Sequence, residues 1–389
     1  MSIMPVTPRA VLEDRWSRLQ TMIRNEGVQA LVLCGRGKIG SYGNIHYVSS
    51  YYLYSVSSYA VLMPDGVPTL VLGNRDQEFA RELGLGDFVP DFQAADFTST
   101  MFRVAGQSAM GEQLVHVLRN KKLTAGPVGI VGLSGIMPVE DYLYVRKTLP
   151  DLELRDVTPA YSAVKAIKSR AEVALIEETY EIADAGFMCF VEQLAVGKTE
   201  WEVCGEVEGT VRKRGALQTY IFSESDEQYP RCATARRYES HDLIACFVEV
   251  IGPNGTWVEK GGTFAFPKTP PSALAIADRA LRALQDVEKV LRPGQPVESA
   301  FRAAQREADR HGYHQGVWAG HGVGVDHDMP ILGDGDPSPF VPGMVIAVHP
   351  HLVDQKTRTG AVFCEQYEIT AGGARRFSRH PIGLMKVTR

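Results

Sequence analysis

Glycine and histidine crowd into one short segment near the C-terminus, Gly320-His321-Gly-Val-Gly-Val-Asp-His327-Asp-Met-Pro330. His321 stands between two glycines, which let the backbone approach a bound group closely. A second segment, Pro342-Gly-Met-Val-Ile-Ala-Val-His349-Pro350, ends an apolar run at a histidine, and such a run predicts a buried strand. Seven of the ten histidines of the chain lie from His311 onward. This skew predicts a site of acid–base or metal chemistry in the C-terminal part.

Two glutamates precede these segments on a predicted hairpin. The apolar runs 243–251 and 256–266 flank the turn Gly252-Pro-Asn-Gly255, which predicts two antiparallel strands. Glu249 lies on the first strand and Glu259 on the second. Because a carboxylate buried in a strand needs a partner, both are candidate site residues. Glu365, on a predicted strand over residues 361–370, is a third.

Elements predicted from periodicity and turn residues surround these strands. The first 160 residues alternate helices and strands, which is typical of an α/β domain, and Asp65-Gly66 predicts a hairpin between 59–63 and 68–72. After residues 164–169, helix pairs interleave with hairpins, as in an α+β domain. The predicted helices are residues 9–27, 75–83, 138–148, a long one through Ile176 and Leu194, one from Glu200, 271–291 and 297–311.

Composition excludes several classes of protein. The 389 residues carry a net charge of −5, so we expect no nucleic-acid partner. The six cysteines include no C-x-x-C pair, so no zinc ribbon or redox motif is predicted. Residues 1–9 lack the apolar stretch of a signal peptide. The uncharged stretch 39–64 is rich in Tyr, Ser and Asn and predicts strands and loops rather than a membrane span. We therefore expect a cytoplasmic protein with no membrane partner.

Five patterns in this order resemble the pita-bread superfamily of creatinases, prolidases, aminopeptidases P and methionine aminopeptidases, which includes the peptidase M24 family. They are residues 164–169 before the long helix, His241-Asp242 ahead of the hairpin, the two segments above, and Glu365 on a strand ending at Thr370. The resemblance implies an α/β creatinase-like N-terminal domain over residues 1–163. It implies an α+β pita-bread catalytic domain over residues 164–389, and a homodimer.

The resemblance also implies positions for metal ligands. Metallopeptidases of the superfamily hold two divalent metals with two Asp, one His and two Glu. The two Asp positions fall near Glu249 and Glu259, the His position at His321, and the first Glu position at His349. The last Glu position falls at Cys364 or at Glu365, because the register is open by one residue.

Other candidates follow from the same resemblance. His327 matches the substrate-side histidine of the superfamily, and His351, at the rim of the expected site, is a candidate substrate-binding residue. Arg231 lies roughly where creatinases keep a catalytic histidine. An arginine there is a candidate anchor for a substrate carboxylate, because its planar fork fits that group.

Charge argues against a two-metal centre. Two divalent ions are balanced by four carboxylates in the family, whereas this chain offers three at most, Glu249, Glu259 and Glu365. The imidazole of His349 cannot bridge two metals as a carboxylate does. Creatinases have this fold and work without metal. A metal-free site is therefore the first expectation. The second is one divalent ion, Zn, Mn, Fe or Co, held among the same three glutamates, His321 and His349, since His₂Glu is a zinc ligand set.

The resemblance implies a hydrolase that cleaves a C–N bond in a small nitrogen-rich substrate, similar to creatinase. In this hypothesis Glu249, Glu259 and Glu365 hold a cationic or amidine-like group. His349 or His321 acts as general base and His327 as proton donor. A metallopeptidase of the Xaa-Pro dipeptidase or aminopeptidase type with altered ligands is the alternative. A lyase and a non-catalytic binding protein also remain open.

Overall fold

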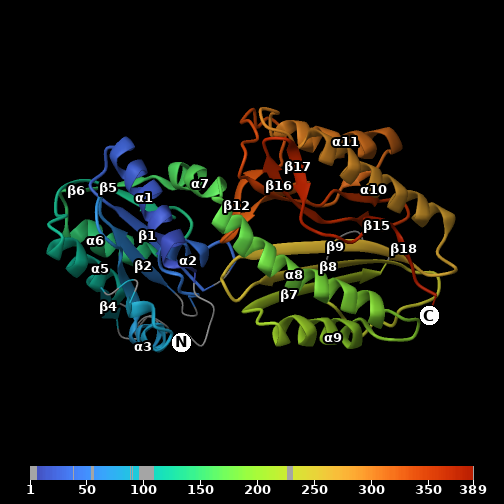
Figure 1. Cartoon of the computed structure of the whole chain (residues 1–389), viewed down its shortest axis with the longest axis horizontal. Coiled ribbons are helices and arrows are strands. Elements are labelled where there is room, and N and C mark those ends of the chain that lie inside the picture. Colours follow the sequence, from blue (N-terminus) through green and yellow to red (C-terminus); the bar gives the residue numbers. More distant parts are fainter. Residues whose placement is uncertain are drawn as a thin grey trace. The chain divides into compact units, whose positions relative to one another are not determined.

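The chain forms two compact units in the computed structural model (Figure 1). One consists of Met1–Lys165 with Val325–His327, and the other of Ala166–Gly324 with Asp328–Arg389. The structure describes residues 7–37, 39–53, 57–87, 89, 91–95, 109–225 and 231–388.

The N-terminal unit is built on a six-stranded mixed sheet with strand order β4-β3-β2-β1-β5-β6. Helices α5 and α6 cover one face, where residues such as Leu114 and Val145 pack against Val32 and Val61 of the sheet. Its elements are α1 (Arg9–Asn25), β1 (Leu31–Gly35), α2 (Gly43–Ser49), β2 (Ser58–Leu62), β3 (Thr69–Gly73), α3 (Asn74–Glu82), the short 3₁₀ helix Leu85–Asp87, β4 (Phe92–Ala95), α5 (Ala109–Asn120), β5 (Gly126–Val131), α6 (Val139–Thr148), β6 (Leu152–Asp156) and α7 (Thr158–Ala166).

The hairpin predicted around Asp65-Gly66 is confirmed. Strands β2 and β3 pair antiparallel, and Gly66 has a φ of +77°, a value that glycine adopts without steric cost. Strand β1 also pairs in parallel with β5, and β5 with β6. The helix–strand alternation of the sequence thus yields the expected α/β unit.

Among its described residues, the C-terminal unit holds three sheets and four helices. Its elements are α8 (Arg170–Gln193), α9 (Glu200–Lys213), β7 (Gln218–Ser225), β8 (Leu243–Ile251), β9 (Trp257–Ala265), α10 (Pro271–Val290), α11 (Glu298–His311), β10 (His314–Gln315), β11 (Gly320–Gly324), β12 (Asp326–Ile331), β13 (Val345–Val348), β14 (His351–Asp354), β15 (Thr359–Val362), β16 (Glu365–Thr370), β17 (Gly373–Arg376) and β18 (Met385–Lys386).

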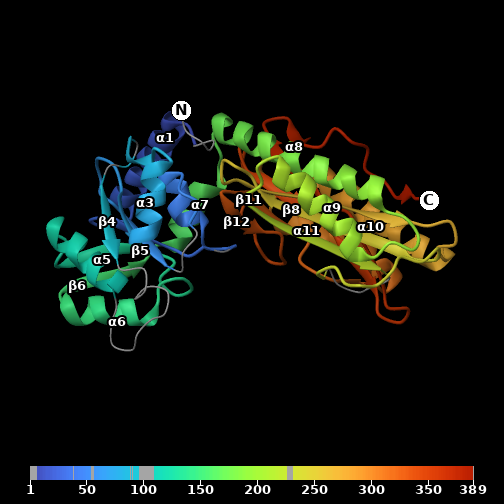
Figure 2. The ribbon, with the colours of Figure 1, turned by 90° about the horizontal axis from the view of Figure 1, so that it is seen from below.

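The strands of this unit lie between two pairs of helices (Figures 1 and 2). Helices α8 and α9 cover the sheet β18-β9-β8-β7, and α10 and α11 cover the sheets β12-β11-β13-β16-β17 and β10-β14-β15. A large apolar cluster joins Ala277 and Leu284 of α10 to Val348 and Tyr367 of the second sheet. This α+β arrangement leaves the facing surfaces of the sheets at the centre of the unit.

Local capping signals set the starts of α8 and α9, the first two helices of the C-terminal unit. Ser169 and Glu172 form a capping box at α8, and Thr199 and Glu202 form another at α9, which satisfies backbone N–H groups that the first turn leaves open. Pro271 lies at the first turn of α10, where proline costs no hydrogen bond. The helices predicted from periodicity are therefore present with boundaries close to those expected.

One predicted element differs. The single strand expected over residues 361–370 is two strands, β15 and β16, in different sheets. Between them Cys364 pairs with Gly261 of β9 through reciprocal backbone hydrogen bonds of 3.1 Å. The break therefore follows from a long-range pairing that periodicity does not report.

Across the described residues, no helix combines the length and the apolar character needed to cross a membrane.

Candidate functional site

Two carboxylates face one another on the hairpin β8–β9. Glu249 and Glu259 are direct cross-strand partners, so both side chains leave the same face of the sheet. The tight turn is closed by a hydrogen bond from Gly252 N to Thr256 O of 2.9 Å. Glu259 is only 1% exposed, and Glu249 is half-buried. The turn and register thus bring together two of the residues that the sequence predicted.

Two histidines from the second sheet contact Glu259. His321 lies on β11, and His349 directly follows β13, the antiparallel neighbour of β11. His321 Nε2 is 3.1 Å from Glu259 Oε1, and His349 Nε2 is 3.8 Å from Glu259 Oε2. The two imidazole centroids are 5.4 Å apart. Three predicted site residues therefore form one buried cluster, which we call the Glu259 cluster, with Glu249 opposite.

Hydrogen bonds fix the orientation of Glu259. Trp257 Nε1 donates to Glu259 Oε1 over 2.7 Å, and the Glu259 backbone N–H donates to Gln366 Oε1 over 3.1 Å. Trp257 and Gln366 are fully buried. Sequence reasoning missed both residues, because an aromatic ring and an amide within apolar strands look like ordinary core residues. They hold the carboxylate where both imidazoles meet it.

The pKa values of Glu249 and His321 are both raised. The raised value favours the neutral form of the glutamate and the charged form of the histidine. Burial, and then the neighbouring Glu259 carboxylate, raise the pKa of Glu249 well above its usual value, so Glu249 keeps its proton more readily. Burial by itself lowers the pKa of His321. Glu259 and the Gly322 carbonyl raise this pKa by more than burial lowers it, so the net shift is upward. His321 Nδ1 is 2.9 Å from Gly322 O. Both nitrogens of His321 thus face acceptors, as an imidazolium requires.

The charge on His321 is expected to depend on Glu259. In wild type the Hε1 resonance of His321 should titrate above pH 6.5, and in Glu259→Gln it should titrate at lower pH, because the anion that favours the charged ring is gone. NMR titration, with His321→Gln for assignment, measures both values. Glu206→Gln, exposed on α9, is the control variant and should leave the His321 titration as in wild type. An unchanged His321 titration in Glu259→Gln would contradict the pairing.

The same pair makes stability depend on pH. Because the folded pKa of His321 is raised, its proton stabilises the folded protein fully below the unfolded value of about 6.5. That contribution is lost as pH rises through the folded pKa. Glu259→Gln should remove this alkaline loss from the stability profile.

His351 lies on the same inner surface beside a residue that sequence reasoning missed. Its Nε2 is 3.7 Å from Glu224 Oε1, and both side chains are almost fully buried. Glu224 pairs with Ala245, so strand alternation puts it on the face of Glu249. Burial, and then His349, lower the pKa of His351 to about 3, so the ring is neutral. The predicted substrate-binding role of His351 stays a prediction.

The structure does not bring Glu365 into the Glu259 cluster. Its carboxylate binds the ammonium of Lys260 and accepts a hydrogen bond of 3.2 Å from Tyr180 on α8. Lys260 follows Glu259 in the strand and so points to the opposite face. Cys364 instead packs with Ala245 on the inner face, and burial raises the pKa of its thiol. Of the two residues between which the register was open, Cys364 therefore lies on the face of the Glu259 cluster and Glu365 does not.

The remaining two candidates, Arg231 and His327, each have an acidic partner of their own. Arg231 donates to both carboxylate oxygens of the buried Glu200 on α9, over 2.7 and 2.9 Å, so its guanidinium has an internal partner. His327 is half-buried in the segment that groups with the N-terminal unit, with Nδ1 3.6 Å from Asp326 Oδ1. Their roles at the substrate stay predictions.

Comparison with known proteins identifies relatives of this arrangement. The chain is 25% identical to an Xaa-Pro dipeptidase of Pyrococcus furiosus over 280 residues, covering 69% of this chain and 77% of the relative. It is 21% identical to a creatinase of a Bacillus species over 410 residues, covering 98% and 93%. A dipeptidase, PepE, from Mycobacterium ulcerans has the same fold with a TM-score of 0.81 at 19% identity, covering 99% of this chain and 100% of that one.

The model of a known family covers about half of the chain. It is that of metallopeptidase family M24, and it matches residues 174–371, from α8 to the end of β16. The matched range includes the whole Glu259 cluster. The pita-bread fold predicted from the sequence is confirmed. The chain belongs to metallopeptidase family M24, a family of hydrolases.

Proposed function

We propose that this chain hydrolyses a C–N bond in a small substrate that carries an amidine- or guanidine-like group. The observation that carries the proposal is the Glu259 cluster itself, one carboxylate between two imidazoles with a second carboxyl, Glu249, opposite. Such a group supplies a proton donor, a proton acceptor and negative charge for a cation. Similarity to creatinase over nearly the whole chain supports the substrate class.

The residues present do not fit the two-metal centre that the family implies. The five ligand positions carry Glu249, Glu259, His321, His349 and Cys364, and only two of these are carboxylates. The thiol of Cys364 stays protonated, whereas a thiol must lose its proton to bind a metal. Glu365 is neutralised by Lys260. The charge of two divalent ions would therefore stay unbalanced at these five positions, and the proposed reaction does not use such a centre.

The geometry favours His349 as the general base. Both nitrogens of His321 face acceptor oxygens, and the pKa of this ring is raised, so we infer that its charged form orients Glu259. In the proposed reaction the water oxygen bonds to the substrate carbon while a water proton passes to His349. The C–N bond then breaks as the leaving nitrogen takes a proton from Glu249, whose raised pKa keeps that proton available. The hydroxyl proton of the intermediate returns to the Glu249 carboxylate as the carbonyl forms, and the proton on His349 passes to the released amine.

A single divalent ion is the second candidate. Its supporting observation is that the Nε2 atoms of His321 and His349 are turned toward the two oxygens of Glu259, a His₂Glu donor set suited to zinc. A bound ion would supply a Lewis acid at these three side chains. The similarity to Xaa-Pro dipeptidases would then point to peptide substrates.

Metal analysis and a substrate panel decide between the two. Protein purified without chelator is assayed by mass spectrometry for metals and then against guanidino and amidino acids and Xaa-Pro dipeptides, before and after dialysis against chelator. We expect turnover of a guanidino or amidino compound that chelation leaves unchanged. Turnover of Xaa-Pro peptides alone, lost with a stoichiometric metal, would overturn the proposal in favour of the second candidate. No turnover of either class would contradict both.

A further inference from the structure

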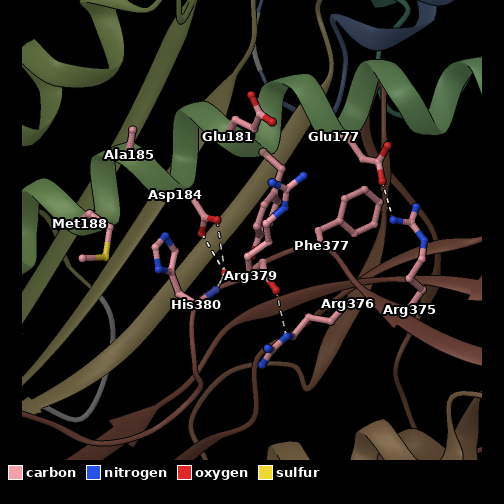
Figure 3. A pocket seen from close by; sticks show the side chains of 12 residues that line it. Glu177, Glu181, Asp184, Ala185, Met188, Arg375, Arg376, Phe377, Arg379 and His380 are labelled. Carbon is pink, nitrogen blue, oxygen red and sulfur yellow. Dashed lines mark hydrogen bonds and ion pairs between the residues drawn. The ribbon is translucent and has the colours of Figure 1, made fainter.

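A separate pocket of about 670 Å³ lies between helix α8 and residues 375–380, which are the end of β17 and the segment that follows it (Figure 3). Helix α8 covers the outer face of the sheet, where Lys260 lies 5.4 Å from the centroid of the Phe187 ring of α8. The Glu259 cluster is on the inner face. The volume is within the range of about 300–1,000 Å³ typical of small-molecule sites.

The two walls of this pocket have opposite charge. Glu177, Glu181 and Asp184 project from α8, at the spacings of three and four residues that place side chains on one face of a helix. The facing segment presents arginines and one histidine. These residues are Arg375, Arg376, Arg379 and His380.

Internal contacts use part of this charge. Arg375 pairs with Glu177 at 2.5 Å and with Glu368 at 2.6 Å. Ser378 Oγ donates to Asp184 over 3.1 Å, and Lys260 Nζ lies 3.9 Å from the same carboxylate. These contacts hold the two walls in place. They leave the pocket with a fixed acidic side and a fixed basic side.

Glu181 and Arg379 supply the charge that a ligand can use. Both are exposed and line the pocket, one from each wall (Figure 3). Across the part of the chain that the structure describes, neither side chain makes a hydrogen bond or ion pair. Half-buried Phe377 and Met188 also line the pocket. An anion or a cation alone would be attracted by one wall and repelled by the other.

We propose that this pocket binds a free α-amino acid. The ammonium group binds at Glu181 and the carboxylate at Arg379, whose planar fork matches a carboxylate. The side chain of the amino acid packs on Phe377 and Met188. A zwitterion is the small ligand that matches both walls at once.

Calorimetric titration of the full chain with three matched probes tests this proposal. L-Leucine carries both charges, leucinamide lacks the carboxylate, and 4-methylpentanoate lacks the ammonium. We expect saturable binding of leucine, and at least about tenfold weaker binding of each single-charge probe, since a charge-assisted hydrogen bond contributes about 1.5–3 kcal/mol. Equal affinities for all three, or no saturable binding of leucine, would overturn the proposal.

Variants locate the binding. Arg379→Gln should weaken leucine about tenfold and leave leucinamide unchanged, and Glu181→Gln should weaken leucine and leave 4-methylpentanoate unchanged. Arg306→Gln on α11 and Glu206→Gln on α9, both exposed and outside the pocket, are matched controls that should bind like wild type. Binding that survives both pocket variants but is lost in Glu259→Gln would place leucine at the Glu259 cluster and overturn the assignment.

Discussion

Replacing Lys260 by methionine is expected to lower the free energy of unfolding of the C-terminal unit by about 3–5 kcal/mol. The ammonium of Lys260 and the carboxylate of Glu365 are each about 2–3% exposed. Removing one partner leaves a buried charge with only the Tyr180 hydroxyl as donor among the side chains shown to contact it. Urea titration followed by tryptophan fluorescence measures the loss, because three of the four tryptophans, Trp201, Trp257 and Trp318, belong to this unit.

A second substitution separates charge from packing. In Lys260→Met/Glu365→Gln the buried charge is gone while the Tyr180 hydroxyl keeps an acceptor, so most of the loss should be recovered. Arg302→Met is the control, because its ion pair with Glu298 is largely exposed and contributes less than about 1 kcal/mol. A Lys260→Met protein as stable as the Arg302→Met protein would rule out the buried pair.

The same double variant tests whether Glu365 belongs to the catalytic machinery. If Glu365 serves only to neutralise Lys260, the variant should keep its turnover of whichever compound the wild type hydrolyses. Loss of turnover in a stably folded double variant would return Glu365 to the substrate site predicted from the sequence.

Glu259→Gln is expected to lower kcat/KM by about 10²–10⁴, the range for loss of general acid–base catalysis, because Glu259 is the group that orients the proposed base His349. The substitution removes the anion that His321 and His349 both face and leaves the shape of the side chain almost unchanged. Steady-state kinetics on the compound turned over by wild type measures it. Glu206→Gln, on the exposed side of α9, is the matched control with no expected change.

The pH profile gives an independent test of this assignment. Turnover in wild type should fall as pH rises through the raised pKa of His321, because the charged ring holds Glu259 in place. A Glu259→Gln protein with wild-type kcat/KM would show that the cluster is structural. In that case the proposed role of Glu259 in orienting the base His349 would be wrong.

Local sequence signals predicted much of the fold. Apolar periodicity gave helices α8 to α11 nearly their observed bounds, and the glycine turn after Ile251 gave the hairpin that pairs Glu249 with Glu259. These signals are local, because turn geometry and amphipathicity depend on residues within a few positions of one another. The order of the motifs also predicted the family, which the family model confirms.

Which face each side chain occupies was decided by tertiary structure. Side chains alternate along a strand, so a shift of one residue exchanges the two faces. The pairing of Cys364 with Gly261 puts a thiol, and not the Glu365 carboxylate, on the side of the Glu259 cluster. No local pattern reports that pairing, because its two strands are far apart in the chain.

By itself, then, the sequence determined the elements, the family and the positions of Glu249, Glu259, His321 and His349 near one another. Only the folded chain determined that Lys260 neutralises Glu365, that Glu224 lies beside His351, and that α8 and residues 375–380 enclose a pocket with two charged walls. The physical reason is the same in each case. Charge compensation and enclosure depend on contacts between distant segments, and those contacts follow from strand register and helix packing.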